Sequence, residues 1–502
     1  MSSEYFILLP VILPVIMGIL LIIFPIKNDR TRNIVNFIFV LLNTWFAFNA
    51  IIALNGESLI LFEIYQDNCF ELGIDKAGSV FGTIVAGLWP FASLYAYGYM
   101  AHQERKNTFF AFFTMTYGVV LGIAFSANLL TMYIFYEMLT LVTFPLVLHP
   151  MTEKAVKAAK TYLAYSLGGA AFGLIGLIFV MHIGSTSFVL GGSISGSARE
   201  AGFLLPSFVL SFCGFSVKAA MAPFSRWLIK AAVAPTPVTA LLHAVAVVNA
   251  GAFACIRLIY YIYGTEILYG TWAQYIVMTL AIITIIFGSS FAVKEGHFKR
   301  RLAYSTISNL SYILFAATIM TPLGITAAFA HMMMHSLTKI CSFFCCGTIM
   351  EQTGKEYVKE LDGMGRKMKL SFACFTVSSL SLIGIPLFCG FFSKWRIGTA
   401  AVSDAAPLTI AGLCALLFSA LLTGIYMLSI VIRAYFPSKP AEDEKTVSKK
   451  LRVSNSDIDR SDNVPEIREH CWQMLLPVAC FAFGILILGV FWQPVLDFVS
   501  FF

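Results

Sequence analysis

The sequence has few charged residues. Asp, Glu, Lys and Arg together make up 12% of the 502 residues, whereas soluble domains average about 25%. Hydrophobic residues account for 58% of the chain, and its mean hydropathy is +0.80. This balance excludes an ordinary soluble protein and predicts a chain that crosses the membrane many times.

The sequence also lacks the motifs of a redox or metal centre. Its 11 cysteines are scattered without a C-x-x-C pair, so neither an iron–sulfur cluster nor a structural zinc site is indicated. Most of them lie in apolar stretches, where cysteine is usually a small packing residue. There is no nucleotide-binding loop and no quinone motif, and the net charge of +7 resides in loops beside the membrane. These absences predict a chain with no cofactor of its own and no nucleic-acid partner.

Long apolar runs dominate what is present. A membrane-spanning helix needs about 20 apolar residues, and by that rule the sequence predicts an all-α polytopic membrane protein with about 14 spans. The first span has neither a basic region ahead of it nor a cleavage site, so we expect a retained anchor. The expected spans are 5–25, 33–53, 78–98, 107–124, 126–147, 157–182, 203–232, 237–262, 270–292, 301–320, 323–349, 370–395, 406–434 and 472–496.

Basic residues indicate which loops face the cytoplasm. Most of the 34 Lys and Arg residues fall in alternate loops, and the opposite loops hold few. Basic loops stay on the cytoplasmic side, so we expect a multi-pass protein of the cell membrane with both termini on the outer side. The basic loops include residues 27–32, 105–106, 154–160, 294–301, 355–369 and 433–468.

The spans divide the chain into five expected parts. A charged stretch at 436–471 is poor in large apolar residues and predicts a flexible cytoplasmic loop. The other parts are the N-terminal spans at 1–106, two sets of five spans at 107–262 and 263–435, and the last span at 472–502.

Two of the expected spans contain a proline near a lysine. Lys218 precedes Pro223 in the seventh span, and Pro386 precedes Lys394 in the twelfth. Proline interrupts a helix, and such breaks are tolerated at membrane depth where they are buried in protein or line a wet cavity. Because the two spans stand five apart, they have opposite topology, as paired transport sites in inverted repeats do. The prolines therefore predict two broken helices on an ion route.

One acidic residue falls at the middle of an expected span. Glu137 lies in the fifth span, within MYIFYEMLTLVTF, where a carboxylate must be neutral, paired or functional. We expect Lys218, two spans later, to be its counter-charge. The alternative is a static ion pair that only fixes helix packing, although a buried pair stabilises a fold poorly.

The eleventh span carries three titratable residues on one face. His331, His335 and Lys339 follow one another at intervals of four, which keeps them on the same side of a helix. Such a row can pass protons, directly or through water. Metal binding by the two histidines is an alternative, but this helix offers no third ligand. We add His243 and Lys394 to the expected route, although His243 alone is ambiguous and Lys394 alone could be a lysine that reaches toward the membrane surface.

These motifs together resemble one known family. NLLTMYIFYEMLTLVTF, the K-x4-P-F-x2-W-L block, APTPVTALLHA, FKRRLAYSTISNLSYIL, AHMMMHSLTKICSFFCCG, LDGMGRKM and GIPLFCGFFSKW occur in that order. They are similar to the antiporter-like subunits of respiratory complex I, of Mrp-type cation/proton antiporters and of energy-converting membrane-bound hydrogenases. The similarity covers residues 75–435.

The resemblance implies a fold, a site and partners. It implies 14 helices with two inverted five-helix repeats, in spans 4–8 and 9–13, and a switchable pair formed by Glu137 and Lys218. The partners would be other membrane subunits, including antiporter-like paralogues and small transmembrane subunits, together with lipids and peripheral redox subunits. Those redox subunits would hold Fe–S clusters and, in a hydrogenase, Ni–Fe. The central hydrophilic axis would consist of His243, His331, His335, Lys339 and Lys394.

The sequence departs from the family pattern at four positions. Tyr136 replaces a frequent Trp, and Lys369 stands where Pro is frequent. Ser225 and Lys230 stand where His and Asp are common. The loss of those two groups puts the cytoplasmic proton entry of the first half in question.

The expected function is ion translocation. An axis of lysines and histidines offers Na⁺ no carboxylate cage, so the proton is the expected ion, with coupling to Na⁺ left open. The main hypothesis is a pump subunit of a redox-driven complex, either hydrogenase-like or complex I-like. The alternative is a subunit of an Mrp-type Na⁺/H⁺ antiporter, and a coupling subunit for inorganic-carbon uptake is a third. We expect no catalytic redox site in the chain itself.

Overall fold

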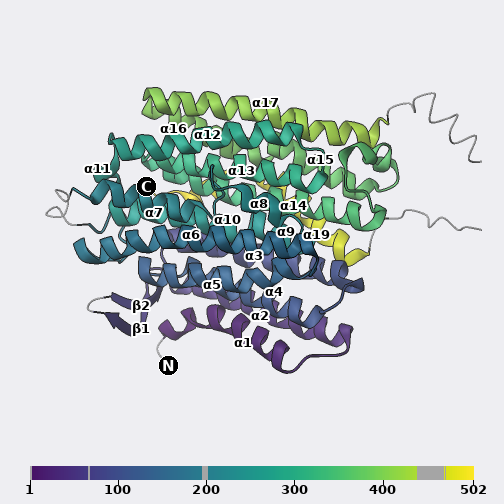
Figure 1. Ribbon diagram of the computed structural model, residues 1–502, viewed down its shortest axis with the longest axis horizontal. Helices are drawn as coiled ribbons and strands as arrows, with labels where there is room; N and C mark the ends of the chain where they lie inside the picture. Colours follow the sequence, from purple (N-terminus) through teal and green to yellow (C-terminus); the bar gives the residue numbers. More distant parts are fainter. Residues whose placement is uncertain (1–2, 66–67, 195–201, 438–468, 470, 502) are drawn as a thin grey trace, which may run out of the picture.

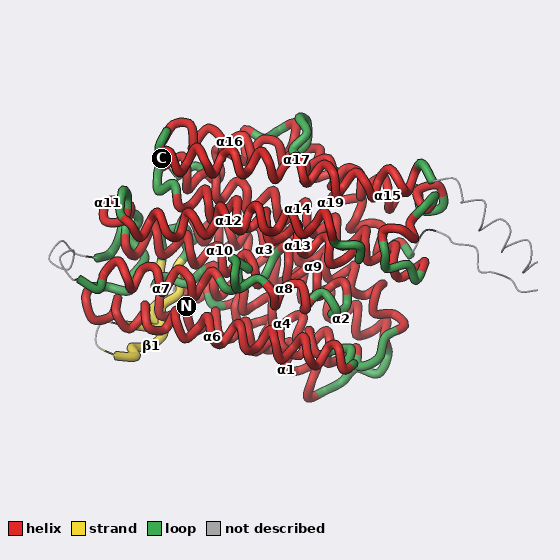
Figure 2. Tube along the Cα trace, turned by 45° about the horizontal axis from the view of Figure 1, so that its top comes forward, coloured by secondary structure: helices red, strands yellow, loops and turns green. Residues whose placement is uncertain are grey.

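The computed structural model describes residues 3–65, 68–194, 202–437, 469 and 471–501. Its long helices run side by side, and their connections gather at the two ends of the bundle (Figures 1 and 2). In Figure 1 the chain progresses from α1 (Leu9–Ile23) at one flank to α17 (Pro407–Tyr435) at the other, and α19 (Trp472–Val490) returns to the middle. Both ends of the chain lie at the same end of the bundle. The expected cytoplasmic loop, 436–471, falls almost wholly outside the described residues.

The other helices follow in chain order. Those of the N-terminal half are α2 (Asp29–Ala53), α3 (Lys76–Tyr99), α4 (Lys106–Ala124), α5 (Leu129–Leu148), α6 (Glu153–Ile183), α7 (Leu204–Ser216), α8 (Arg226–Ala231), α9 (Thr236–Ala244) and α10 (Val247–Arg257). Those of the C-terminal half are α11 (Thr265–Leu268), α12 (Trp272–Lys294), α13 (Phe298–Thr318), α14 (Pro322–Thr353), α15 (Lys369–Ile383), α16 (Cys389–Asp404) and α20 (Gln493–Val499).

Length and composition identify a multi-pass membrane protein. Nine helices of the described residues are long and apolar enough to cross a membrane, and α1, α7 and α15 are shorter apolar helices. α13 and α14 are not among the nine, although they have 21 and 32 residues. Both are buried in protein over most of their length, and a helix that does not face lipid can carry polar side chains. α14 packs against α9, α13, α15, α16 and α19.

Polar side chains cap many of the helices. The fourth and fifth expected spans are separated by a short connection, because α4 ends at Ala124 and α5 begins at Leu129. There the Asn128 side chain accepts a hydrogen bond from the Thr131 N–H at 2.8 Å, which stabilises the first turn of α5. The capping residues with this kind of bond include Asn28, Asp75, Asn128, Thr152, Thr271 and Thr321.

The two prolines singled out in the sequence lie in helix breaks. Pro223 is in the gap between α7 and α8, and Pro386 is in the gap between α15 and α16. Lys218 lies two residues past the end of α7, not inside an apolar helix as expected. Because α7 ends well before the proline, the lysine stands on irregular backbone.

The eighth expected span is also broken, which the sequence does not indicate. α9 ends at Ala244, α10 begins at Val247, and a π-helix follows at Leu258–Tyr263. The Asn249 side-chain amide donates to the Ala244 carbonyl at 2.8 Å and to the Ser336 hydroxyl at 2.7 Å. A side chain thus binds a carbonyl freed by the break, and no proline or glycine marks the position.

A two-stranded hairpin was not expected. β1 (Ser58–Tyr65) pairs antiparallel with β2 (Asn68–Gly73) at one end of the bundle (Figure 2). The Gly73 N–H donates to the Phe125 carbonyl at 2.7 Å, and the Asn128 side-chain amide donates to the Cys69 carbonyl at 2.9 Å. The hairpin is therefore tied to the α4–α5 turn. Strands of six to eight residues are too short to register in a search for apolar runs of about 20 residues.

Asp75 caps α3 and binds a buried arginine on α10. Its carboxylate accepts hydrogen bonds from both terminal nitrogens of Arg257, each at 2.5 Å. The Arg257 side chain is 1% exposed. Burial raises the pKa of Asp75, but the neighbouring guanidinium outweighs burial, and the pKa lies below its ordinary value. Three aromatic rings lie within 5 Å of the guanidinium carbon, those of Phe188, Phe253 and Tyr261.

The variant Asp75→Asn should destabilise the protein by roughly 2 kcal/mol. Breaking a fully buried pair costs about 3–5 kcal/mol, and solvent screening reduces that cost here because the Asp75 side chain is 38% exposed. The folded protein lowers the pKa of Asp75, so the wild-type advantage is present above the ordinary value of 3.8 and is lost as the pH falls through the lower folded value. Thermal melts of both proteins in detergent at neutral and acid pH measure the effect. An advantage that is unchanged in acid would contradict it.

Candidate functional site

The Glu137 carboxylate and the Lys218 ammonium group face each other inside the bundle. Glu137 Oε1, on α5, lies 3.6 Å from Lys218 Nζ, and the two side chains are 23% and 1% exposed. Nζ also donates a hydrogen bond to the Tyr136 carbonyl and lies 3.4 Å from the centroid of the Tyr136 ring. Within the described residues Oε1 has no hydrogen-bond partner, so its contact with Nζ is an ion pair slightly longer than a hydrogen bond. The two expected counter-charges therefore lie together.

Close packing holds the irregular backbone around Lys218. The Trp227 indole N–H donates to the Val217 carbonyl at 2.8 Å. A Cβ atom on Gly251 of α10 would lie 2.4 Å from the backbone nitrogen of Ala219 and 2.8 Å from the carbonyl carbon of Lys218. Glycine at position 251 is therefore what allows α10 to approach the break so closely.

Two buried histidines have free ring nitrogens. His243 lies in the last turn of α9, with its ring centroid 4.9 Å from that of Phe343. His335 lies on α14. In the described parts of the chain neither ring nitrogen of either residue has a hydrogen-bond partner. Buried polar groups are normally hydrogen-bonded, so these four nitrogens are unsatisfied in this arrangement of the helices.

The three titratable residues of α14 are all buried. The ring centroids of His331 and His335 lie 6.3 Å apart, and His331 Nδ1 is 2.9 Å from the Ser393 hydroxyl. Lys339 Nζ donates to the Ser305 hydroxyl at 2.6 Å and to the Leu302 carbonyl at 3.3 Å. No cluster of three or more His, Cys, Asp or Glu side chains suited to a metal occurs among the described residues. The alternative of a metal site on His331 and His335 therefore gains no third ligand from them.

A row of hydroxyl groups that sequence reasoning missed extends from Lys339. The Tyr426 hydroxyl donates to the Ser305 hydroxyl oxygen at 2.8 Å and lies 3.1 Å from the Thr423 hydroxyl. Ser419, Thr423 and Tyr426 recur at intervals of four and three on α17, so they share one face. That spacing was the available signal. A search for charged residues passes over neutral hydroxyl groups.

Tyr312 connects the end of this row with Lys394. Its hydroxyl is 2.5 Å from the Ser419 hydroxyl. Its ring centroid lies 5.4 Å from that of His331 and 5.4 Å from Lys394 Nζ. The α14 residues and the α17 hydroxyl groups therefore converge on the same tyrosine.

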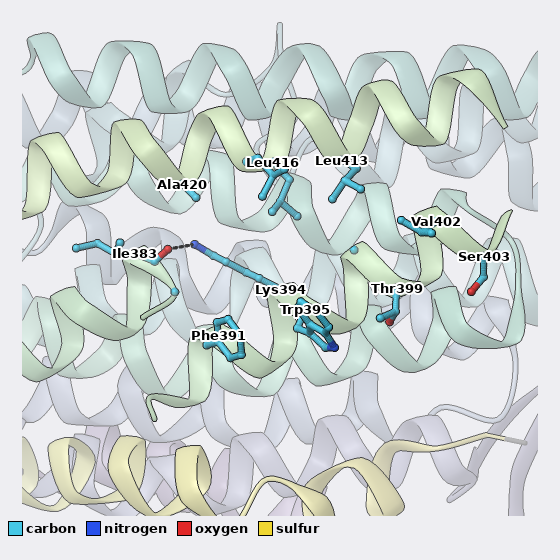
Figure 3. Close-up of a pocket in the computed structure, with 13 residues that line it drawn as sticks. Ile383, Phe391, Lys394, Trp395, Thr399, Val402, Ser403, Leu413, Leu416 and Ala420 are labelled. Carbon is cyan, nitrogen blue, oxygen red and sulfur yellow. Dashed lines mark hydrogen bonds between the residues drawn. The ribbon is translucent and has the colours of Figure 1, made fainter. Parts of the chain in front are cut away.

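Lys394 lies beside a cavity between α16 and α17. Its side chain extends toward the end of α15, where Nζ donates to the Leu382 carbonyl at 2.5 Å and to the Ile383 carbonyl at 3.2 Å (Figure 3). Carbonyls at the C-terminal end of a helix favour a cation. The cavity has a volume of about 540 Å³ and a mainly apolar lining. Two of its lining residues, Trp395 and Leu417, are 61% and 56% exposed, so Lys394 lies close to the protein surface.

Two cations of the FKRR motif turn inward, although the sequence analysis assigned them to a loop. Lys299 is 5% exposed, and its Nζ donates to the Ala234 carbonyl at 2.5 Å. Arg301 is 8% exposed and donates to the Ser429 hydroxyl at 2.8 Å and to the Tyr426 carbonyl at 3.1 Å. Arg301 therefore adjoins the hydroxyl row. Counting basic loop residues treats all of them alike and cannot distinguish the buried ones.

The structure defines the class of this protein. It is a multi-pass helical membrane protein with a buried row of ionisable side chains. The family model described as NADH:quinone oxidoreductase/Mrp antiporter, TM, matches residues 126–423. The chain belongs to this family. The matched residues include all of the expected route from Glu137 to Lys394, and the resemblance inferred from the motifs is confirmed.

The relatives include a NADH-quinone oxidoreductase subunit and subunits of cation/proton antiporters. The chain is 26% identical over 434 residues to NADH-quinone oxidoreductase subunit N of Desulforudis audaxviator (strain MP104C), covering 85% of this chain and 83% of the relative. It is 30% identical over 328 residues to the A/B subunit of a probable K⁺/H⁺ antiporter from Rhizobium meliloti (strain 1021), covering 65% of this chain. It is 28% identical over 343 residues to the A1 subunit of a Na⁺/H⁺ antiporter from Staphylococcus aureus (strain JH9), also covering 65% of this chain. The matches span only 32% and 42% of these two antiporter subunits.

Solved structures share the fold over its whole length. A chain of the Mrp complex from Dietzia sp. DQ12-45-1b superposes with a TM-score of 0.85 at 21% identity, covering 100% of this chain and 97% of that one. A chain of the membrane-bound sulfane sulfur reductase, an archaeal respiratory membrane complex, superposes with a TM-score of 0.82 at 20% identity, covering 98% and 96%.

Proposed function

We propose that this chain is the ion-translocating, antiporter-like subunit of a multisubunit membrane complex and that it moves protons. The observation that carries the proposal is the Lys218 ammonium group, 1% exposed and 3.6 Å from the Glu137 carboxylate, on a broken helix. An ionisable group inside a membrane protein is expensive to maintain and usually functional. Membership of the family and the multisubunit complexes to which its relatives and structural neighbours belong support a role among partner membrane subunits.

We further propose the topology on which this role depends. The chain crosses the membrane 14 times, with inverted repeats at 107–262 and 263–435, the N-terminal spans at 1–106 and the last span in 472–502. The even number of crossings agrees with the two termini lying at the same end of the bundle. The basic loops then face the cytoplasm and the termini lie outside the cell membrane.

The Glu137–Lys218 pair is the proposed switch. While the carboxylate is close, it stabilises the protonated form of Lys218. When the pair separates, the buried ammonium group loses its charged partner, and the proton is released toward His243. The contact of 3.6 Å is longer than a hydrogen bond, and turning Lys218 toward His243 breaks the hydrogen bond from Nζ to the Tyr136 carbonyl. A partner subunit must supply the movement.

The proton then passes along the second half of the molecule. Within the described residues the ring nitrogens of His243 and His335 have no hydrogen-bond partner. We propose that water enters when the helices move and joins these histidines to Lys218 on one side and to Lys339 on the other. His331 and Tyr312 lead on to Lys394, which releases the proton at the outer side.

Proton entry is proposed in the second half of the molecule, at Tyr426 beside Arg301. The residues that replace the family's usual His and Asp offer no substitute, because Ser225 is buried without a charge and Lys230 donates to the Thr161 hydroxyl at 3.1 Å. In the second half, Arg301 donates to the backbone carbonyl of Tyr426. The Tyr426 hydroxyl donates to the Ser305 hydroxyl, which also accepts a hydrogen bond from Lys339. We propose that this row supplies cytoplasmic protons to Lys339.

Two kinds of complex remain as candidates. The match to NADH-quinone oxidoreductase subunit N covers most of both chains and favours a redox-driven complex, with Fe–S clusters in peripheral subunits and, if the complex is hydrogenase-like, Ni–Fe as well. The fold match to the Mrp complex is equally complete and supports the alternative, a subunit of an Mrp-type Na⁺/H⁺ antiporter.

Composition of the native complex should separate these candidates. We expect metal analysis and mass spectrometry of the gently purified complex to find iron and cluster-bearing subunits, because the match to NADH-quinone oxidoreductase subunit N covers most of both chains. A complex that is intact but free of redox metals would contradict the first candidate and support the Mrp-type one.

The variants Glu137→Gln and Lys218→Ala should each abolish coupled proton transport, since either change removes one half of the switch. The measurement is proton uptake by proteoliposomes that contain the purified complex, with subunit stoichiometry checked in parallel. Lys154→Gln, at an exposed lysine of α6, is the control and should transport normally. Wild-type transport in either test variant would refute the pair as the switch.

The variant Tyr426→Phe should slow transport by roughly tenfold. It removes the hydroxyl that connects Ser305 with Thr423 and keeps the ring. The loss should be smaller than the roughly 10²–10⁴-fold typical of removing a proton-transfer group, because water can partly replace a hydroxyl. Tyr263→Phe is the matched control, since this buried tyrosine binds Ser207 at 2.9 Å away from the row. Equal rates for the two variants would exclude the row as a route.

A further inference from the structure

A second cavity shares no lining residue with the ionisable route and lies at the end of the bundle that carries the basic loops. It has a volume of about 400 Å³ and lies between the α1–α2 and α3–α4 connections. Four cationic side chains line it, and the single carboxylate among the lining residues is that of Asp29. The cations are Lys27, Arg32, Arg105 and Lys106.

Arg32 is a buried cation among the residues that line this cavity. Its side chain is 3% exposed and donates to Asp29 Oδ1 at 2.8 Å and to Asn33 Oδ1 at 3.0 Å. Its remaining nitrogen, Nε, is buried without a hydrogen-bond partner among the described residues. Lys106 Nζ also binds Asp29, at 2.5 Å. One carboxylate therefore serves two cations, and the lining of the cavity keeps an excess of positive charge.

The start of α4 adds a second feature that favours an anion. Among the described residues no side chain caps this helix, and its first backbone hydrogen bond runs from the Phe109 N–H to the Arg105 carbonyl at 3.1 Å. The earlier N–H groups are left for an external acceptor, and the helix dipole adds positive potential at this point. Lys106, Asn107 and Thr108, which carry those groups, line the cavity.

The surroundings of the cavity point to lipid. α2 runs from the cavity into the membrane with large apolar side chains exposed, including Ile34 at 50%, Ile38 at 58% and Trp45 at 58%. The last residues of α1 continue this apolar surface, with Ile23 at 59% and Phe24 at 67%. A ligand with its phosphate in the cavity could therefore lay acyl chains along the two helices, whereas free phosphate would use only the cavity.

We propose that this cavity binds the phosphate headgroup of an anionic phospholipid from the cytoplasmic leaflet. Basic pockets between membrane helices on that side are suited to such headgroups. The cations attract the phosphate, the first N–H groups of α4 donate hydrogen bonds to it, and the acyl chains cover the apolar faces of α1 and α2. The bound lipid ties the N-terminal spans to α4.

The test uses the purified complex with the full chain, stripped of lipid in neutral detergent. Native mass spectrometry and thermal melting are recorded after addition of phosphatidylglycerol, phosphatidylcholine or inorganic phosphate. Phosphatidylglycerol should be retained and raise the melting temperature, and the other two should not. If inorganic phosphate has an equal effect, the ligand is free phosphate and the lipid proposal is wrong. If the complex retains no phosphatidylglycerol, the proposal is also overturned.

Two variants with opposite expected effects locate the site. Lys27→Gln/Arg105→Gln should weaken phosphatidylglycerol binding by roughly 30-fold, at about fivefold for each charge near the membrane surface. Asp29→Asn should strengthen it by about fivefold, because it removes the competing carboxylate. Lys154→Gln/Lys160→Gln, at two exposed lysines of α6, is the matched control and should leave binding unchanged. Equal losses in the control and test variants would show general surface attraction and refute a defined site.

Discussion

The Lys218 ammonium group is buried inside a membrane protein. Several features of the first half of the fold offset the unfavourable free energy of burying this charge. A buried cation without compensation is too unfavourable to persist. Compensation comes from the Glu137 carboxylate together with the carbonyl and ring of Tyr136. The break after α7 frees the lysine from helical geometry, and Gly251 lets α10 pack directly against that break. The position of one charge thus accounts for a helix end, a close helix contact and an aromatic residue.

In the second half of the chain, the buried lysines are hydrogen-bonded to neutral groups. Lys339 is bound by a hydroxyl and a carbonyl, and Lys394 by two carbonyls. In the described parts of the chain neither forms an ion pair with a carboxylate. A movement of helices can therefore change the charge environment most strongly at Lys218, where an anion approaches or leaves. In the proposed mechanism this asymmetry places the control of transport in the first half and the conduction of protons in the second half.

The sequence was sufficient to predict the features that are marked by long apolar runs, by prolines or by charged residues. Apolar runs predicted a multi-pass membrane protein, two prolines fell where α7 and α15 give way to irregular backbone, and Glu137 met Lys218 as expected. The missed features have weaker signals. The break before Val247 has no proline or glycine, and it is stabilised by the side chain of Asn249, a contact that exists only after folding. The α17 hydroxyl groups are uncharged, and Lys299 is a loop residue by sequence although its side chain is buried. The spacing of polar groups on one helix face would have found the hydroxyl groups, whereas the burial of a loop lysine depends on the tertiary structure.

In the proposed mechanism the Glu137–Lys218 pair opens and closes while the complex works. The most direct measurement is the structure of the assembled complex at rest and during turnover, at a resolution that places both side chains. The account predicts the contact of 3.6 Å between Glu137 Oε1 and Lys218 Nζ in one state and a separated pair in the other, with Lys218 turned toward His243. The same contact in every state, with transport under way, would contradict it.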